Sequence, residues 1–510
     1  MTSLFSPVKG LSFEMVSALT APDYFDDLNL PEYINVVLEE PDDAELRPYF
    51  YYASKTKNEA AYRQSVAKDL CDPDIRAAVN RFILGIIVSR RYQMLSEKTE
   101  SVQKWKWRLD TIVQYYDSIE LFCSDLQQMP PKSEALLTLR DELNKIITSA
   151  DVVNLRKQAG DINDEFEKMK FRLTIGKDNA VLDFDYSDDD YCNEIRSEFL
   201  RSEESADSHS FTESPFGDMN VSPLENFILE QFMKRNRPLF RNLETFCGIN
   251  RNIITTEVSD IVREFRFYLL NLDYMARMKV KNFPITFTKF SEDREVNLDD
   301  CYDIVLAEKN SSENKEIVFN DIMKSGNETA IIVTGPNQGG KTTLARSFGQ
   351  AAYFTAMGLP VAANSAKMPF FDRIYTLFAS MTGNTVEGRL EHELDLIKST
   401  LDSVSKESLV IFNELFTSAS TVDALSMMRD LMSRLIAKGA ILFVVTHTFE
   451  LAYDSDNYVS LVATVVEDGS FRRTFRLIRK PADGVAYANS IVDKYKLDYE
   501  HIKVRLSNKR

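Results

Sequence analysis

A glycine-rich turn followed by lysine and threonine is the stretch of this sequence whose residue types and spacing best support chemistry. An apolar, β-branched run at 331–333 precedes it, a helical pattern follows it, and its residues are Gly335, Pro336, Asn337, Gln338, Gly339, Gly340, Lys341, Thr342 and Thr343. Close approach of backbone to a phosphate requires glycine, and the N–H groups at the start of the next helix attract an anion. The spacing therefore predicts a phosphate-binding loop, and an accidental glycine-rich turn is the weaker alternative.

Two strand ends carry residues that would serve Mg²⁺ and the attacking water. Lys341 adds charge for the β- and γ-phosphates of a nucleoside triphosphate, and Thr342 offers a hydroxyl to the metal. The buried run 408–412 ends in Asn413 and Glu414, where such strands normally carry two acidic residues. We expect Asn413 to hold Mg²⁺ weakly, because its carbonyl oxygen carries no charge, and Glu414 to act as the general base. The alternative is a site that binds ATP without hydrolysing it.

A histidine follows the apolar run 441–445, after Thr446. At the end of a core strand beside a phosphate loop, His447 is well placed to sense the γ-phosphate. A lone histidine is more often structural, but the positions of the other two motifs favour a functional role here. Glu414 and His447 are therefore the predicted catalytic residues, with ATP and Mg²⁺ as the predicted cofactors.

Composition restricts the class of protein. The chain has 510 residues, 44 % of them hydrophobic, and a formal net charge of −17, which predicts a globular protein of about two to four domains and argues against a generic basic DNA binder. No run approaches the roughly 18–20 apolar residues of a membrane span, and the N-terminus lacks a signal-peptide pattern. The scattered cysteines fit a cytoplasmic protein without a disulfide frame or zinc site: Cys71, Cys123, Cys192, Cys247 and Cys301.

The pattern changes along the chain. Residues 24–180 show helical spacing, residues 183–218 are acidic and serine-rich, and a long helix is expected around 258–272. Trp105 and Trp107 are expected to pack within the helices rather than to stack on bases. From residue 283 onward strands alternate with helices, which predicts an α/β domain with a parallel central sheet. A hairpin turn is expected at 467–470.

Four blocks together resemble the DNA mismatch repair protein MutS family, and they lie at 334–343, 372–376, 408–423 and 446–451. The resemblance is strong over 283–495 and weaker over 24–280. It implies an all-α core with lever helices followed by an α/β P-loop ATPase domain of the ABC class. By this resemblance the domains are 1–182 (helical core), 183–221 (an acidic insertion in place of the DNA clamp), 222–282 (returning lever helices) and 283–510 (ATPase domain). Ile317 would then pack near the adenine.

The resemblance also implies a homodimer in which each ATPase site is completed by the other subunit, with Asp423 at the dimer face. Several positions depart from the family pattern. No room remains for the N-terminal mismatch-reading domain, the insertion is acidic, and no C-terminal dimerisation module follows residue 495. Gly388 stands where a serine is expected, and Arg389 is a candidate substitute. Mismatch recognition is therefore not inferred.

The sequence thus predicts an ATP-hydrolysing, MutS-related protein whose ATP-driven dimer closure moves helical arms, with DNA as a possible partner and no membrane association. A basic cluster offers a candidate DNA contact, although a solvated strand face is the stronger interpretation: Arg472, Arg473, Arg476, Arg479 and Lys480. The alternative function is an ATP-gated protein-interaction switch without a nucleic-acid role, which the net negative charge favours.

Overall fold

The computed structural model describes two compact units of the chain. The described residues are 1–7, 11–99, 102–169, 172–175, 180–183, 223–251, 253–378, 386–417, 419–466, 473–482 and 502–503. The first unit, here called the α/β unit, contains Met1–Ala77, Met129–Leu139 and Asp260–Arg510. The second, here called the helical unit, contains Ala78–Gln128 and Arg140–Ser259. The α/β unit thus combines Met1–Ala77 with Asp260–Arg510, whereas the sequence analysis assigned 1–182 and 283–510 to different domains.

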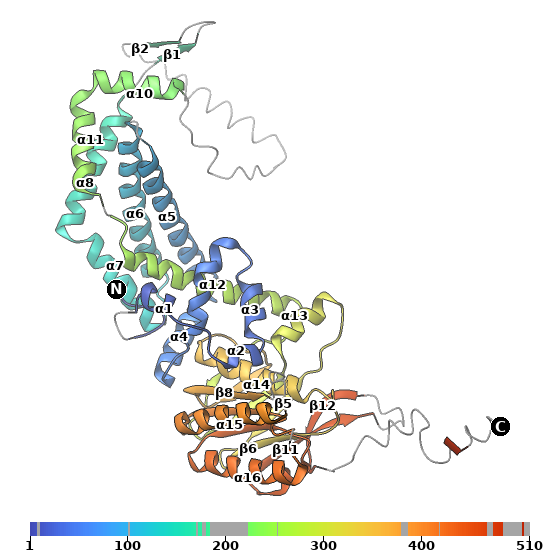
Figure 1. Ribbon diagram of the computed structural model, residues 1–510. Helices are drawn as coiled ribbons and strands as arrows, with labels where there is room; N and C mark the ends of the chain where they lie inside the picture. The colour runs from blue at the N-terminus through green and yellow to red at the C-terminus, as the bar shows by residue number, and fades with distance from the viewer. Residues whose placement is uncertain are drawn as a thin grey trace. The chain divides into compact units, whose positions relative to one another are not determined.

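Long helices make up most of the helical unit (Figure 1). They are α5 (Pro73–Lys98) and α7 (Glu134–Ile147), which both begin in the α/β unit, and α6 (Gln103–Gln128), α8 (Ala150–Glu167), α10 (Pro223–Arg235) and α11 (Arg237–Ile249). Helix α6 packs against α8 and α11. The rings of Phe82 and Phe122 stack at 4.5 Å between α5 and α6. Trp107 stacks on Tyr92 at 5.3 Å, so its packing role is confirmed.

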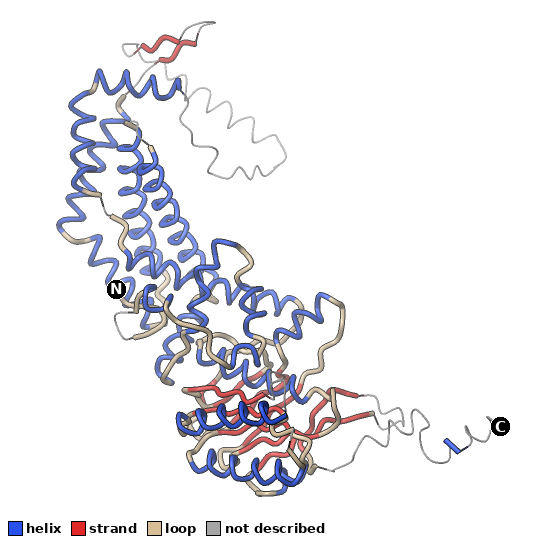
Figure 2. The backbone as a smooth tube through the Cα atoms, viewed as in Figure 1, coloured by secondary structure: helices blue, strands red, loops and turns tan. Residues whose placement is uncertain are grey.

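One segment contradicts the helical prediction. The sequence pattern predicts helix to about residue 180, but α8 ends at Glu167, and β1 (Arg172–Ile175) and β2 (Ala180–Asp183) form an antiparallel hairpin (Figure 2). Leu173 pairs with Leu182 in this hairpin. These short runs contain β-branched residues and do not continue the helical period, and such runs favour extended strands. Apart from its first residue, the acidic insertion predicted at 183–221 lies outside the described residues, as does Ser222 before α10.

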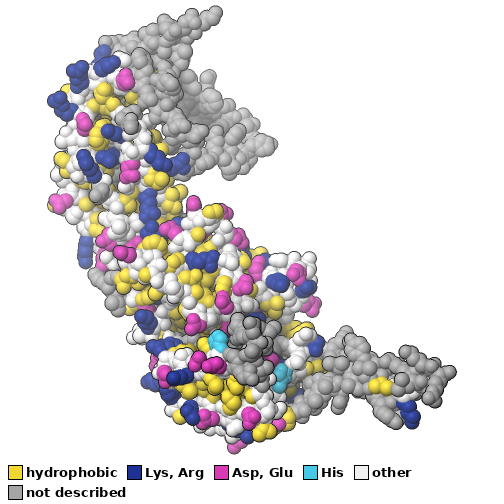
Figure 3. Space-filling model, in the orientation of Figure 1, with side chains coloured by type: hydrophobic (Ala, Val, Ile, Leu, Met, Phe, Trp, Pro, Cys, Tyr) yellow, Lys and Arg dark blue, Asp and Glu magenta, His cyan; other side chains and the backbone are white. Residues whose placement is uncertain are grey.

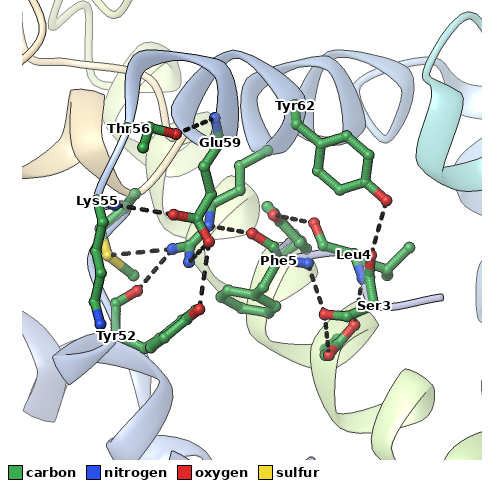
Figure 4. Close-up of polar contacts among 12 residues, drawn as sticks. Ser3, Leu4, Phe5, Tyr52, Lys55, Thr56, Glu59 and Tyr62 are labelled. Atoms are coloured by element: carbon green, nitrogen blue, oxygen red, sulfur yellow. Dashed lines mark hydrogen bonds and ion pairs between the residues drawn. The ribbon is translucent and has the colours of Figure 1, made fainter. Parts of the chain in front are cut away.

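Short helices surround the first residues of the chain in the α/β unit. They are α1 (Phe13–Ser17), α2 (Tyr24–Asp27), α3 (Leu30–Val37), η1 (Pro41–Tyr51) and α4 (Lys57–Asp69), together with most of α12 (Thr256–Val280). Arg63 of α4 is fully buried and donates to the carbonyl oxygens of Phe5 and Tyr52, at 2.7 Å each. Tyr62 donates to the carbonyl of Ser3 at 2.9 Å (Figure 4). Residues 2–6 therefore belong to the core of this unit.

Glu264 of α12 accepts hydrogen bonds from the same buried segment. The amide of Leu4 donates to it at 2.6 Å, and the hydroxyl of Ser3 donates at 2.7 Å. Burial raises the pKa of Glu264 from 4.5 to about 7, against the opposing effect of these two hydrogen bonds. In the folded protein this carboxyl group therefore keeps its proton at pH values where the unfolded chain has lost it.

This shift predicts a pH-dependent stability. Between pH 4.5 and about 7 the folded state binds more protons at Glu264 than the unfolded state does, so the free energy of unfolding falls as the pH rises through this window. The contribution lost by pH 8 is about 3 kcal/mol. Urea unfolding at pH 4.5 and pH 8 measures it. Glu264→Gln should lose that much less than the wild-type protein, and equal losses would contradict the assignment.

A six-stranded sheet is the centre of the α/β unit. Its strands are β6 (Ala330–Thr334), β8 (Arg373–Phe378), β9 (Ser408–Asn413), β10 (Ile441–Val445), β11 (Tyr458–Val465) and β12 (Arg473–Arg479), in the spatial order β12-β11-β6-β10-β9-β8. All neighbours are parallel except β11 and β12, which pair antiparallel. The predicted parallel sheet is confirmed, with one antiparallel edge strand, although the predicted turn at 467–470 lies outside the described residues.

Helices cover this sheet and explain why its central strands are apolar throughout (Figure 1). They are α14 (Lys341–Ala356), α15 (Val386–Ser403), α16 (Thr421–Ala437) and the short η2 (Phe449–Tyr453), whereas α13 (Ile304–Ser312) packs against α3. Phe348 of α14 meets Phe443 of β10 at 5.4 Å. Ile332, Phe412 and Val444 instead join a core cluster with α15 and α16 residues. A strand buried on both faces needs apolar residues at successive positions.

A smaller, four-stranded sheet was not predicted from the sequence. It contains β3 (Lys289–Phe290), β4 (Val296–Cys301), β5 (Asn320–Lys324) and β7 (Ser365–Met368), in the order β3-β7-β4-β5. Its strands are short, and β4 and β5 alternate buried residues with more exposed ones. Strands β4 and β5 flank α13, so this sheet helps to place the segments before and after that helix beside the phosphate loop.

No helix among the described residues is long and apolar enough to cross a membrane.

Candidate active site

The predicted site residues lie at one edge of the central sheet. Strand β10 pairs with both β6 and β9, and Val445 stands opposite Val333 on one side and Asn413 on the other. Because these strands are parallel, their carboxyl ends meet at the same edge, and the residues that follow each strand are neighbours in space. The glycine-rich loop, the Asn413–Glu414 pair and His447 are thereby brought together, although up to 112 positions separate them in the sequence.

The backbone of the loop explains its glycines. Gly335 and Gly340 have φ angles of +124° and +94°, which side-chain-bearing residues rarely adopt. A Cβ at Gly335 would also lie 2.9 Å from the Cβ of Ala463 on β11, and one at Gly339 would lie 2.9 Å from the carbonyl oxygen of Pro336. Gly340 is the N-cap of α14, so the N-terminal N–H groups of this helix point into the site.

Lys341 is held inside the loop. Its side chain is 4 % exposed, and its ammonium group donates to the carbonyl oxygens of Gly335 at 3.0 Å and Pro336 at 3.1 Å. A carboxylate oxygen of Glu414 lies 3.8 Å away. Burial lowers the pKa of Lys341, and Glu414 partly opposes this effect. The ammonium group therefore stands where it can exchange two carbonyl oxygens for the more negative oxygens of a phosphate.

Thr342 and Asn413 are direct partners. The threonine hydroxyl donates to the side-chain carbonyl oxygen of Asn413 at 3.0 Å. Both groups offer neutral oxygen atoms, which are suitable ligands for Mg²⁺ or its bound water. In the described part of the chain, no group of three or more His, Cys, Asp or Glu side chains could hold a metal alone. The oxygen atoms of Thr342 and Asn413 fit Mg²⁺ that arrives with a triphosphate.

Glu414 and His447 form a second pair. Nε2 of His447 lies 2.9 Å from a carboxylate oxygen of Glu414. The hydrogen bond from His447 lowers the pKa of Glu414, with help from the positive charge of Lys341 and against the effect of burial. The glutamate is therefore ionised at neutral pH, as a general base must be.

The backbone at Glu414 is strained. Its φ angle is +57°, and Phe416 two positions later has a φ angle of +59°. Such left-handed conformations cost on the order of 1–3 kcal/mol each for residues with side chains, and they persist where the surroundings hold them. One restraint is the hydrogen bond from the amide of Glu414 to the carbonyl of Val445, at 2.9 Å.

A pocket of about 390 Å³ opens beside these residues. Six of the predicted loop residues line it, as do Glu414 and Ile317, the residue expected near the adenine: Gln338, Gly339, Gly340, Lys341, Thr342 and Thr343. The remaining loop residues, Gly335, Pro336 and Asn337, are not among the lining residues. The pocket is large enough for a nucleotide, because ligand pockets begin at about 300 Å³.

The sequence analysis did not identify several residues that line this pocket: Tyr302, Asp303, Leu306, Asn310 and Phe475. Asp303 is the N-cap of α13 and also accepts a hydrogen bond from Gln350 at 2.8 Å. Its N-cap pattern was detectable in the sequence. At the pocket, Asn320 of β5 donates to the carbonyl oxygen of Phe475 at 3.1 Å, and no local sequence pattern predicts that contact.

Asp423, Gly388 and Arg389 are not among the residues that line the pocket. Asp423 is exposed in the first turn of α16, where its amide donates to the N-cap Ser420. The side chain of Arg389 lies outside the described part of the structure, and Gly388 is in the first turn of α15. Within the basic cluster, Arg479 forms an ion pair with Glu328, which agrees with a strand-face role for that residue.

Replacing Asn413 by aspartate should strengthen Mg²⁺ use. The added charge would lie 3 Å from the hydroxyl of Thr342 and should lower the Mg²⁺ concentration for half-maximal turnover by about tenfold. Titration of ATP hydrolysis with Mg²⁺ measures this. Asn457→Asp adds the same charge at an exposed position of the same unit and should change nothing. An unchanged requirement in Asn413→Asp would remove Asn413 from the metal site.

Comparison with known proteins matches the part of the chain that carries this site. Residues 331–495 match the family described as MutS domain V. The DNA mismatch repair protein MutS of Streptococcus uberis is 28 % identical over 176 residues, which cover 33 % of this chain and 21 % of the relative. That of Macrococcus caseolyticus is 26 % identical over 246 residues, covering 45 % and 28 %. That of Thermotoga neapolitana is 24 % identical over 229 residues, covering 44 % and 27 %. The matched segments thus span less than a third of these relatives.

Proposed function

Because the chain belongs to the MutS family through residues 331–495, we propose that it is a Mg²⁺-dependent ATPase of a DNA-repair or recombination type. The observation that carries this proposal is that Lys341, Thr342 and Glu414 line one pocket, while Asn413 contacts Thr342 and His447 contacts Glu414. The segments that follow β6, β9 and β10 supply these groups. The stability of an α/β fold does not require such polar groups at one edge of the sheet.

The roles follow from the geometry. Lys341 leaves the carbonyl oxygens of Gly335 and Pro336 and binds the β- and γ-phosphates, assisted by the first N–H groups of α14. Thr342 and Asn413 hold Mg²⁺ or its water. The metal, when bound, supplies charge that neutralises the triphosphate. Glu414 accepts the proton of the attacking water, and His447 orients that carboxylate and senses the γ-phosphate.

Two copies of the α/β unit are proposed to close on each other when ATP binds. Support comes from the first turn of α16, where Val422 is 78 % exposed beside the exposed Asp423. Both side chains are therefore accessible to a partner subunit. Closure of this kind converts a local phosphate contact into movement of the helices.

DNA is the proposed partner of the helical unit, without mismatch reading. On the face shown in Figure 3, Lys and Arg side chains gather on this unit. Five basic residues of this unit are exposed, four of them within 234–241: Lys168, Lys234, Arg235, Arg237 and Arg241. Lys168 and Arg235 line a groove of about 590 Å³. Basic side chains along a groove suit a phosphate backbone, and binding of this kind weakens as salt rises.

The proposal is tested by measuring ATP turnover, size and DNA binding together. We expect Mg²⁺-dependent hydrolysis, a doubling of mass by light scattering with a non-hydrolysable ATP analogue, and filter binding of duplex, branched or single-stranded DNA that falls with salt and changes with nucleotide. An ATPase that dimerises but binds no DNA would instead be the ATP-gated protein-interaction switch. Absence of nucleotide binding at millimolar concentration would exclude both functions.

A further inference from the structure

A buried glutamate on α15 faces the strained loop that carries Glu414. Glu393 is 5 % exposed, whereas Glu391, His392, Leu394 and Asp395 around it are exposed. Its carboxylate accepts the backbone N–H of Phe416 at 3.1 Å. Buried carboxylates are rare in proteins because burial disfavours their charge, and burial raises the pKa of Glu393 despite this hydrogen bond. An apolar residue here would join the surrounding core, so the carboxylate needs a specific explanation.

The hydrogen bond holds one end of a short segment whose other end is also held. Glu414 and Phe416 both have left-handed φ angles, of +57° and +59°. The amide of Glu414 donates to Val445, and the amide of Phe416 donates to Glu393. The side chain of Phe416 is 2 % exposed and lies in the core cluster that also contains Ile397 of α15. Residues 414–416 are thus fixed between β10 and α15.

We propose that Glu393 is a positioning residue for hydrolysis, because its hydrogen bond to Phe416 keeps residues 414–416 in the conformation that directs the Glu414 carboxylate toward Lys341 and His447. The inference rests on the proposed role of Glu414 as general base. It adds a physical link between α15 and the reacting groups. A shift of α15 would reach Glu414 through one hydrogen bond and two backbone units.

This link has a consequence for regulation. By the resemblance to the MutS family, a turn that faces the partner subunit would lie at 387–391, around Gly388 and Arg389, and these residues fall in the first two turns of α15. Glu393 follows them directly on the same helix. A partner subunit that moves or fixes the first turns of α15 would therefore change the position of Glu414. The rate of hydrolysis would then depend on dimer closure. A misplacement of about 1 Å is enough to change rates by roughly a hundredfold.

The test compares one substitution that keeps an acceptor for the amide of Phe416 with one that removes it. Glu393→Gln retains an oxygen at the same distance and should keep kcat within about threefold of wild type. Glu393→Ala removes the acceptor and should lower kcat by about 10- to 100-fold, with the Kd for ATP changed less than about threefold. Asp395→Ala, an exposed carboxylate two positions away on the same helix, is the matched control and should behave as wild type.

A second background separates positioning from general stability. In Glu414→Gln protein the base is already lost, so adding Glu393→Ala should reduce the residual turnover by less than about twofold. A full additional loss would show that Glu393 acts through something other than Glu414 and would overturn the inference. If Glu393→Ala does not fold, Glu393→Asp replaces it, because the shorter side chain withdraws the carboxylate from Phe416, and the same outcomes apply.

The two proposals fail in different ways. A wild-type protein without ATP turnover overturns the proposed function and this inference with it. Turnover that is lost in Glu414→Gln but kept in Glu393→Ala overturns the inference alone. Equal losses in Glu393→Gln and Glu393→Ala also overturn it, because the amide of Phe416 keeps its acceptor in only one of the two.

Discussion

Glu414→Gln should lower ATP turnover by about 100- to 10,000-fold and leave the Kd for ATP within about threefold of wild type. Glutamine has the size of glutamate and can still accept the hydrogen bond that His447 makes at 2.9 Å, so the architecture of the site is preserved. It cannot accept a proton from water at neutral pH. The loss should therefore fall on kcat rather than on binding, and single-turnover hydrolysis combined with a nucleotide titration separates the two.

The pH profile provides a further check on Glu414. Because His447 and Lys341 lower its pKa below the ordinary glutamate value of 4.5, the carboxylate stays charged from neutral pH down to that range. Wild-type turnover should thus not decline through protonation of Glu414 between pH 7 and about pH 5. Glu407→Gln is the matched control for Glu414→Gln, because Glu407 is exposed just before β9 begins, and its turnover should equal that of wild type. Wild-type turnover in Glu414→Gln would show that another group activates water.

Lys341→Met should weaken nucleotide binding by about 100-fold and abolish measurable hydrolysis at micromolar ATP. Methionine keeps most of the length of the lysine side chain but removes a charge that would make hydrogen bonds to two phosphates, and each such charged hydrogen bond contributes about 1.5–3 kcal/mol. Isothermal titration with ATP and with ADP measures the affinity. The loss should be larger for ATP, because the γ-phosphate is absent from ADP.

The same substitution should not destabilise the protein without nucleotide. The side chain of Lys341 is 4 % exposed, and its burial lowers its pKa, which means that the charged form is disfavoured in this site. A neutral methionine avoids that penalty but leaves the carbonyl oxygens of Gly335 and Pro336 without this donor, so the melting temperature of Lys341→Met should stay close to that of wild type. Lys398→Met, at an exposed position on α15, should alter neither affinity nor melting temperature. Tight ATP binding by Lys341→Met would contradict the phosphate role of this lysine.

The N-terminal segment shows where sequence reasoning reached its limit. The sequence predicted helical spacing over residues 24–180 and did not predict their partners in α14. Arg346 of α14 donates to the carbonyl of Asp27 at 2.9 Å, and Gln350 donates to that of Leu28 at 3.0 Å. These bonds join groups more than 300 positions apart in the chain. Backbone carbonyls have no residue-specific signal, so their partners cannot be read from composition or periodicity.

Local sequence patterns alone predicted the glycine-rich loop, the strands β6, β9 and β10, and the candidate site residues Lys341, Thr342, Asn413, Glu414 and His447. Each of those predictions depends on spacing within about ten residues, where backbone geometry restricts what a pattern can mean. Tertiary structure alone decided the β1–β2 hairpin, the four-stranded sheet, the place of Phe475 in the pocket and the contact of Glu393 with Phe416. Those features depend on contacts between segments that are distant in the sequence. Such contacts are decided by the packing of the whole unit rather than by neighbouring residues.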